Sequence, residues 1–273
     1  ACAGCEVDTS RMDPRLMGIV NVTPDSFSDG GLYLDPQAAI AHGEELVREG
    51  ADILDVGGES TRPGAEPVPV GEELRRVVPV VEGLVGAGTT ISVDTSKAAV
   101  AAAALDAGAE IVNDVTALRG DPEMADLCAE RGATVILMHM LGEPRTMQVD
   151  PRYDDVVEEV GAFLAGRVEA AVAAGVAEER VWLDPGIGFG KTAGHNLELL
   201  RRLGELRRLG RPLVVGTSRK SFIGQADGSP AGERVGGTIA TSLLAAEAGA
   251  DVLRVHDVGP LRQALAVAAA VLG

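Results

Sequence analysis

Residues 50–57 read Gly-Ala-Asp-Ile-Leu-Asp-Val-Gly, and this stretch joins the end of a predicted helix to a predicted strand. Its glycine can take the left-handed conformation that ends a helix, and the apolar run after it is typical of a buried strand. The same Gly-Ala pair precedes an apolar run at Gly108, Gly132 and Gly249. Four copies of one helix-to-strand junction predict a fold made of repeated βα units.

Eight apolar segments fit this pattern as strands, at residues 17–22, 52–57, 90–94, 110–114, 134–139, 181–184, 212–217 and 251–256. Between them the sequence has helical period, at residues 36–48, 72–85, 97–107, 155–174, 196–209 and 231–248. No dinucleotide-type glycine fingerprint follows the first strand, which favours a closed (β/α)8 TIM barrel over an open sheet. A length of 273 residues suits one such domain. We expect a flexible tail at residues 1–15 and the barrel at residues 16–273.

Composition agrees with this fold and excludes several partners. The chain is 46% hydrophobic but only 3% aromatic, as expected for aliphatic parallel strands packed under helices. A net charge of −17 argues against binding to nucleic acid or to an anionic membrane surface. No apolar run approaches the roughly 18 residues of a membrane span, and the N-terminus lacks the layout of a signal peptide. We therefore expect a soluble, cytoplasmic protein.

The three cysteines predict no disulfide framework. Cys2 and Cys5 form a C-x-x-C in the tail, and Cys128 lies in a predicted helix. A single such pair without further ligands is a weak metal or redox signal, so an unstructured tail is the preferred interpretation. The odd count fits a reducing compartment.

Polar residues gather where the predicted strands end. Loops at the carboxyl ends of barrel strands carry the active sites of this fold. Alone, Asp94 could cap a helix, Asp184 could begin an Asp-Pro turn, and His139 could be a core histidine. Together they predict a binding site at one rim, formed by Asn21, Asp55, Asp94, Asn113, Asp114, His139, Asp184, Ser218 and His256.

Cationic residues lie at the same strand ends of this acidic chain. They are Arg62, Arg219, Lys220, Arg254 and His256. A bound polyanion would need such a cluster, assisted by helix N-termini and a divalent metal. Pairing with surface carboxylates is the alternative explanation, and Arg219 is the weakest member.

Two long segments of the chain carry distinctive motifs. Residues 18–31 read GIVNVTPDSFSDGG and residues 55–64 read DVGGESTRPG, and both resemble long, specific signatures of the dihydropteroate synthase family. Shorter matches follow in the family's order: SVDT at 92–95, VNDV at 112–115, MHM at 138–140, DPGIGFGK at 184–191, SRKSFIG at 218–224 and RVHD at 254–257. The resemblance covers residues 17–257.

The resemblance implies a reaction between a dihydropterin methyl diphosphate and 4-aminobenzoate, which yields 7,8-dihydropteroate and diphosphate by dissociative substitution. The implied pterin-binding residues are Asp94, Asn113, Met138, Asp184, Phe189 and Lys220. Those implied for diphosphate are Asn21, Thr61, Arg62, Arg254 and His256, with Asn21 also a ligand of the cofactor Mg²⁺. Those implied for 4-aminobenzoate are Phe27, Thr61, Arg62, Pro63, Lys220 and Ser221.

The implied catalytic residues are Asp94, Lys220, Arg254 and His256. They would neutralise the leaving diphosphate and stabilise a pterin cation by preorganised electrostatics. No covalent intermediate is needed, so Cys128 and the serines are expected to be structural. The family is usually a homodimer that forms through helices on the outside of the barrel.

Two other functions remain open from the sequence. A methyltetrahydrofolate methyltransferase resembles this fold, but it has no use for a diphosphate cluster or for long first and second loops. A non-catalytic pterin-binding paralogue would show damage in the loop motifs or in the Ser-Arg-Lys segment, and none is visible here. An assay for diphosphate release separates these alternatives.

Overall fold

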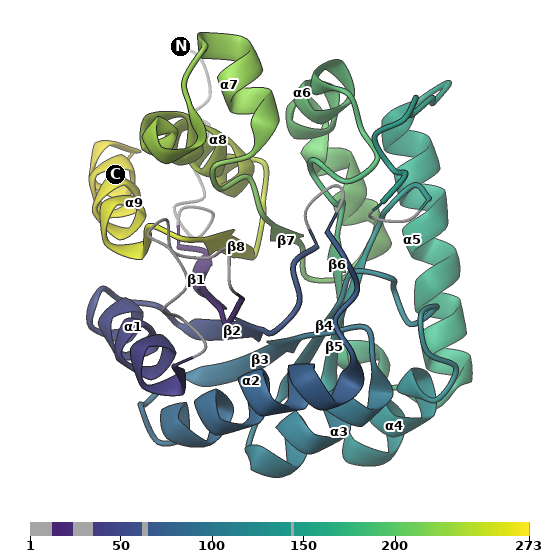
Figure 1. Cartoon of the computed structure of the whole chain (residues 1–273). Helices are drawn as coiled ribbons and strands as arrows, with labels where there is room; N and C mark the ends of the chain where they lie inside the picture. Colours follow the sequence, from purple (N-terminus) through teal and green to yellow (C-terminus); the bar gives the residue numbers. More distant parts are fainter. Residues whose placement is uncertain (1–12, 24–34, 62–64, 143–144, 273) are drawn as a thin grey trace, which may run out of the picture.

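A computed structural model describes residues 13–23, 35–61, 65–142 and 145–272. These residues form a sheet of eight parallel strands in the order β6-β5-β4-β3-β2-β1-β8-β7. Its two end strands are joined by a bridge between Leu183 and Leu213 and by a 2.9 Å hydrogen bond from Leu183 N to Pro212 O. The sheet therefore closes into the expected (β/α)8 barrel, with helices around it (Figure 1).

The strands are β1 (Arg15–Asn21), β2 (Ile53–Gly57), β3 (Thr90–Asp94), β4 (Ile111–Asp114), β5 (Thr134–Met138), β6 (Val181–Asp184), β7 (Val214–Val215) and β8 (Val252–Val255). The α-helices are α1 (Pro36–Arg48), α2 (Val70–Leu84), α3 (Ala98–Ala107), α4 (Met124–Arg131), α5 (Val156–Ala173), α6 (Ala193–Arg201), α7 (Ser221–Asp227), α8 (Val235–Glu247) and α9 (Val258–Leu272). The described residues also form the 3₁₀ helices η2 (Glu178–Arg180), η3 (Leu203–Leu209) and η4 (Ala231–Glu233).

The repeated Gly-Ala pair forms the predicted helix ends. Gly108 follows α3 with φ of 115°, and the N–H of Ala109 donates to Ala104 O at 2.9 Å. This six-residue closure is the Schellman motif. Equivalent bonds join Ala51 to Leu46, Ala133 to Cys128 and Ala250 to Ala245. Each pair therefore satisfies a terminal carbonyl and directs the chain into the next strand.

Alternation along the strands separates two parts of the core. Strand residues such as Leu54, Val112 and Leu253 belong to the large cluster that packs against the helices. The residues that alternate with these along each strand point into the barrel. Toward the amino ends of the strands they form an apolar layer of Met17, Ile53, Ile111, Ile136, Trp182, Val214 and Val252. The apolar layer fills one end of the barrel, and most inward positions beyond it, toward the carboxyl ends of the strands, are polar.

The predicted strands are confirmed, with ends that differ by at most two residues. β7 is the shortest, at Val214–Val215, and a turn follows it in which Lys220 N donates to Thr217 O at 3.2 Å. β1 begins at Arg15, one residue before the predicted start of the barrel. The rest of the predicted tail, including Cys2 and Cys5, lies almost entirely outside the described residues.

Two predicted helices need correction. The segment 196–209 is not one helix, because α6 ends at Arg201 and η3 begins at Leu203. The segment 231–248 begins with the 3₁₀ turn η4 after Pro230, and α8 starts only at Val235. The helical spacing of apolar residues continues across both breaks, so this spacing could not show where the helices end or begin. The helix expected around Cys128 is confirmed as α4, whereas α7 and α9 were not predicted.

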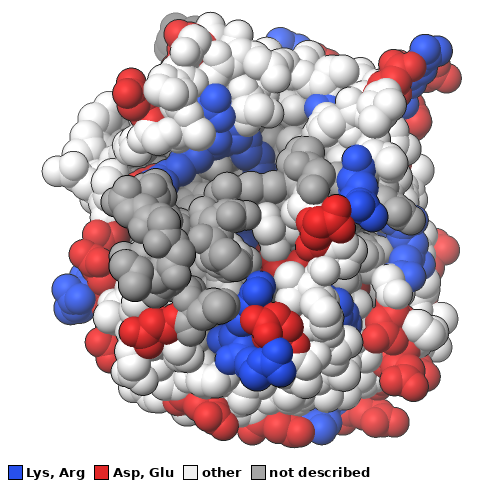
Figure 2. All heavy atoms as spheres, viewed as in Figure 1, with Lys and Arg blue, Asp and Glu red and all other residues white. Residues whose placement is uncertain are grey.

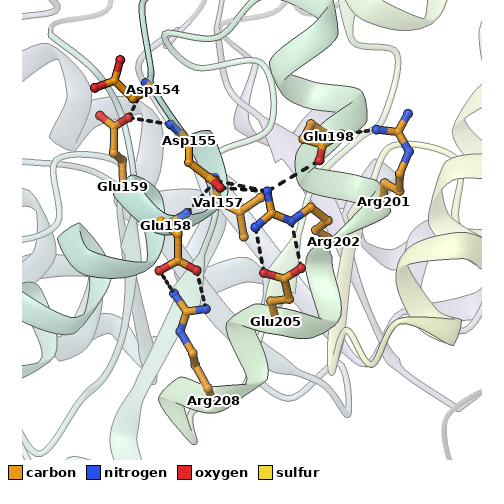
Figure 3. Close-up of polar contacts among 10 residues, drawn as sticks. All are labelled: Asp154, Asp155, Val157, Glu158, Glu159, Glu198, Arg201, Arg202, Glu205 and Arg208. Atoms are coloured by element: carbon orange, nitrogen blue, oxygen red, sulfur yellow. Dashed lines mark hydrogen bonds and ion pairs between the residues drawn. The ribbon is translucent and has the colours of Figure 1, made fainter.

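The break at Arg202 coincides with an ion-pair network (Figure 3). The Arg202 guanidinium donates to Glu205 at 2.8 and 2.9 Å and to Asp155, the N-cap of α5, at 3.0 Å. Arg208 forms a two-bond pair with Glu158 of α5, at 3.0 and 2.9 Å. Exposed pairs contribute little individually, but this network fixes η3 against α5.

The C-terminal helix completes the ring. Gly259 N donates to Glu49 Oε2 at 3.0 Å, and Arg262 pairs with Asp52 at 2.5 Å. These bonds fasten α9 to the junction between α1 and β2, so the last element packs beside the first (Figure 1). Within the described residues, no helix combines the length and the apolar character needed to cross a membrane.

Candidate active site

The inner surface of the barrel becomes polar toward the carboxyl ends of the strands. Two positions beyond the apolar layer, the inward residues of β2, β4, β5, β6 and β8 are Asp55, Asn113, Met138, Asp184 and Arg254. Asp94 of β3 lies level with Asn113 in the sheet. Because parallel strands end at one rim, these side chains share one end of the barrel.

Arg254 is the centre of a hydrogen-bonded group. Its Nε donates to Asp55 Oδ2 at 2.6 Å, and its Nη2 donates to Asp94 Oδ2 at 2.8 Å. Asn113 Nδ2 donates to the same Asp55 oxygen at 3.0 Å. One guanidinium therefore joins side chains from four strands, and two of the residues predicted to bind pterin share this group with one predicted to bind diphosphate.

Burial and neighbouring charges set the ionisation of this group. Burial raises the pKa of Asp94 to about 7, with the Arg254 cation opposing the shift and the Asp55 charge adding to it. Burial alone would lower the pKa of Arg254, but the carboxylates of Asp55 and Asp94 reverse this, and the net pKa is raised. Arg254 thus stays charged, whereas Asp94 can change protonation near neutral pH.

A second group lies around β6 and the segment after β7. Asp184 Oδ1 accepts from Gly186 N at 2.7 Å, while Lys220 donates to Ile187 O and its Nζ lies 4.6 Å from the centre of the Phe189 ring. Burial raises the pKa of Asp184, and Lys220 opposes this shift. Burial lowers the pKa of Lys220 to about 8, with Asp184 opposing it. The pair therefore places opposite charges beside an aromatic face.

An apolar wall accompanies these polar groups. Met138 and Phe189 pack in one small cluster with Val115, Met140 and Met147, separate from the main core. A flat heterocycle needs apolar faces and polar edge partners together. The described part of the predicted pterin set therefore contains both kinds of contact.

The residues predicted for diphosphate are only partly brought together. His256 follows β8, and its Nδ1 lies 2.9 Å from Ser218 Oγ, so the segments after β7 and β8 are linked. Asn21 ends β1 and is half-buried. Arg219 has φ of 57° and pairs with Asp257 at 2.6 Å, which explains why it was the weakest cationic candidate.

The set predicted for 4-aminobenzoate is the least complete in the structure. Thr61 is half-buried after β2, and Ser221 is exposed at the start of α7. Phe27, Arg62 and Pro63 lie outside the described residues. Among the described members of this set, Lys220 lies beside Phe189.

The alternative explanations for single residues have mixed outcomes. Asp94 bonds Arg254, whereas the N-cap of α3 is Lys97 without a side-chain cap bond. Asp184 both forms the predicted turn and lies in the site. His139 is a buried histidine bonded to Lys191 at 2.9 Å. Burial raises the pKa of the Cys128 thiol to about 12, which fits its predicted structural role.

The sequence did not reveal the ion pairs that hold the chain after β2, next to the motif at residues 55–64. Lys97 pairs with both Glu59 and the fully buried Glu73, whose Oε1 accepts from the Thr95 hydroxyl at 2.7 Å. Glu59 also accepts from Val68 N at 3.0 Å, so it links two points of the chain after β2. Glu73 lies in the apolar phase of α2, with Val77, Val80 and Leu84. A glutamate among the apolar positions of a predicted helix was the sequence signal that could have indicated this buried ion pair.

Asp55 was predicted to lie at the rim but was given no role. It is fully buried, and its Oδ2 accepts from both Arg254 and Asn113. Its Oδ1 and the Oγ of its strand neighbour Ser92 have no hydrogen-bond partner in the described part of the chain. Asp55 therefore orients two site residues with one oxygen.

The surface of this face carries basic side chains close to the site. In Figure 2, viewed as in Figure 1, several Lys and Arg side chains lie around the middle of this face, together with some Asp and Glu side chains, and further Asp and Glu side chains lie toward the margin. An overall charge of −17 makes this local basic region notable. The arrangement suits an anionic ligand at the mouth of the barrel.

Comparisons with known proteins show the family of the chain. The family profile described as pterin binding enzyme matches residues 17–256. The dihydropteroate synthase of Escherichia coli K12 is 47% identical, covering 98% of this chain and 95% of its own. The Yersinia pestis dihydropteroate synthase with a sulfonamide drug complex is 46% identical at TM-score 0.91, covering 99% and 98%. The Xanthomonas albilineans dihydropteroate synthase with 4-aminobenzoic acid is 52% identical at TM-score 0.89, covering 95% and 94%. The chain belongs to the pterin binding enzymes and, among them, to the dihydropteroate synthases, which are transferases.

Proposed function

We propose that the protein joins a dihydropterin methyl diphosphate to 4-aminobenzoate, with release of 7,8-dihydropteroate and diphosphate. The main support is the half-buried Arg254, held by Asp55 and Asp94 at the rim where Asp184 and Lys220 also lie. It combines a fixed cation for an anionic leaving group with carboxylates for a heterocycle. Family membership supports the same reaction.

Asp94, Asn113, Asp184 and Lys220 would hold the pterin. The amino-pyrimidinone edge of a pterin presents adjacent N–H donors, which a carboxylate accepts as a pair. Asn113 and Lys220 suit the ring nitrogens and carbonyl. Met138 and Phe189 would cover the ring faces, and both belong to the apolar cluster beside these groups.

The diphosphate would lie toward β1 and β8, at Asn21, Arg254 and His256, with Thr61 and Arg62 from the second motif. Among the described residues, no group of three or more His, Cys, Asp or Glu could hold a metal. Mg²⁺ keeps most of its ligands as water and phosphate oxygen, so a single neutral oxygen from Asn21 fits this ion. When bound, Mg²⁺ would supply charge neutralisation for the phosphates.

The second substrate would lie near Lys220, Ser221 and Thr61, with Phe27, Arg62 and Pro63. Two relatives support this assignment, because one was solved with 4-aminobenzoic acid and another with a sulfonamide drug. We expect sulfonamides to compete for the same place.

The reaction would proceed without a covalent enzyme intermediate. The bond between the pterin methylene and diphosphate oxygen breaks, and its electron pair leaves with diphosphate. The resulting cation is delocalised into the pterin ring, the arylamine nitrogen donates its pair to the methylene, and one proton is lost. Arg254 and His256 would stabilise the leaving charge, while Asp94 would stabilise the cation. Cys128 is buried and outside this site.

Activity is the first prediction. Diphosphate release should require both substrates and Mg²⁺, and Arg254→Lys should lower kcat/KM on the order of 10²-fold, because lysine cannot bridge two carboxylates as a fork. The measurement is a coupled diphosphate assay. Arg262→Lys, at the junction of α1 and β2, is the matched control and should keep near-parental activity. No release with all three components present would favour the non-catalytic alternative.

Pterin recognition by Asp184 gives the second prediction. Asp184→Asn preserves volume and can keep the acceptor for Gly186 N, but it turns a donor toward the donors of the pterin. Pterin binding should weaken by about 2–4 kcal/mol, as measured by calorimetry. Asp251→Asn, where the side chain accepts from Leu213 N before β8, should bind as the parent does. Equal affinities for Asp184→Asn and parent would refute the assignment.

The third prediction is a dependence of pterin affinity on pH. The pKa of Asp94 is raised to about 7, so its carboxyl is protonated in the empty site as pH falls below this value. Pterin donors need the carboxylate, so the affinity should be lost as pH falls, by up to about tenfold per unit below pH 7. Titration of 6-hydroxymethylpterin at several pH values measures this. Asp94→Asn should bind weakly with little pH dependence, and an unchanged slope in it would assign the titration to another group.

We also propose a homodimer. Exposed apolar side chains of α8 and α9 form one face, where Leu244 is 57% and Val271 is 79% exposed, beside Leu243, Ala268 and Leu272. Such faces on a monomer commonly mark contact with another chain. Light scattering should give twice the 28.0 kDa chain mass. Leu244→Glu with Val271→Glu should give monomers, whereas Val149→Glu, exposed elsewhere, should not. A monomeric parent would refute this arrangement.

A further inference from the structure

The segment between β6 and α6 is held by side chains along its whole length. The backbone carbonyl oxygens of residues 186–190 each accept a side-chain hydrogen bond. Lys191 donates to Gly186 O at 2.9 Å and Phe189 O at 3.0 Å, Lys220 to Ile187 O, Gln148 to Gly188 O at 2.7 Å, and Tyr153 to Gly190 O at 2.7 Å. Loop carbonyls commonly face water. This loop is instead fixed in one conformation by the protein.

Close packing leaves the loop little alternative. Gly186 has φ of 66°, and a Cβ there would lie 1.9 Å from His139 O. Gly190 has φ of 61°, and its Cβ would lie 2.8 Å from Leu141 O. The loop therefore lies directly on the chain that follows β5, and only glycine fits at both contacts.

Lys191 connects these two segments. It is 3% exposed, and besides its two loop carbonyls its Nζ lies 2.9 Å from His139 Nδ1 and 3.3 Å from His139 O. Burial lowers the pKa of His139 to about 3, and the Lys191 charge acts in the same direction. The imidazole is therefore neutral, and its Nδ1 can accept from the lysine.

Charge balance explains how a buried lysine is tolerated. Burial lowers the pKa of Lys191 strongly, and Asp184 opposes this shift. Four acceptors surround Lys191 Nζ, which carries at most three N–H groups, so each donor has a partner. A buried polar group with this many partners restricts the conformation of everything bonded to it.

The groups fixed by Lys191 are those that face the proposed pterin. Phe189 gives its carbonyl to Lys191 and its ring to Lys220. Gly186 gives its carbonyl to Lys191 and its N–H to Asp184. Lys191 therefore bonds Phe189 directly and is linked to Asp184 through Gly186.

We propose that Lys191 is a positioning residue for pterin binding: by clamping the 186–190 loop onto His139, it holds Phe189 and Asp184 in their binding orientation in the absence of substrate. This rests on the proposed function, because the ligand it serves is the pterin. The diphosphate partners Arg254 and His256 are held separately, by Asp55 and Ser218. Loss of Lys191 should therefore act on one ligand and spare the other.

The test compares binding of two probes to Lys191→Met. Methionine keeps the length of the side chain but removes every donor. The dissociation constant of 6-hydroxymethylpterin should rise at least tenfold by calorimetry, whereas that of Mg²⁺-diphosphate should change less than twofold. In steady-state assays, KM for the pterin substrate should rise more than kcat falls.

A stability control separates positioning from general damage. Arg211→Met removes a side-chain donor to Glu178 O, 2.7 Å away at the opposite end of the barrel. It should lower Tm without changing either dissociation constant. If Lys191→Met does not fold, Lys191→Gln keeps one donor group and should show the same split, with at least a threefold weaker pterin affinity.

The outcomes distinguish this inference from the proposed function. Parent protein that fails to bind the pterin would refute the proposed function itself. Parent-like pterin affinity in the Lys191 variants would overturn the positioning role alone. An equal loss of pterin and Mg²⁺-diphosphate affinity would also overturn it, because it would show that Lys191 supports the whole barrel rather than this loop.

Discussion

The bridge of Arg254 between Asp55 and Asp94 is the constraint on which the rim depends. A guanidinium in a barrel interior is costly unless carboxylates compensate it, and a buried carboxylate needs a cation or donors in turn. The three groups come from β8, β2 and β3, which are near neighbours in the sheet, and the inward curvature of these strands brings their side chains together. Asn113 of β4 joins through the same Asp55 oxygen. The positions of the site residues and the curvature of the sheet are thus linked.

The two sides of the site are supported differently. Around Arg254 the support comes from strands, whose backbone is fixed by the ladder. Around Phe189 it comes from a loop with no ladder bonds, and side chains such as Lys191 and Tyr153 hold its carbonyls instead. Below both lies a dry apolar layer that includes Met17 and Trp182. The described parts of the site, around Arg254 and Phe189, are thus held in place by the protein itself, which limits the reorganisation cost of binding there.

Particular residues show why sequence reasoning stopped where it did. Asp94, Asn113 and Asp184 could be placed at one rim, because parallel strands of a barrel end together. The hydrogen-bond partner of each side chain could not be predicted from the sequence, since any cationic residue of the rim was a candidate. The break at Arg202 escaped notice because apolar spacing continues through η3, and only its bonds to Asp155 and Glu205 mark it. Glu73 is a different case, because the sequence shows a charged residue among the apolar positions of a helix. Its partner Lys97 lies outside that helix, so the pairing itself could not be predicted.

The sequence by itself determined the repeated units, the order of strands and helices, and the motifs that tie the chain to its family. These are local properties, set by period, by the Gly-Ala helix ends and by short runs of residue types. Tertiary structure alone decided which charges meet. Asp55 and Arg254 are 199 positions apart, and Lys191 and His139 are 52 apart. Their contact depends on the curvature and register of a closed sheet, and no local pattern encodes these.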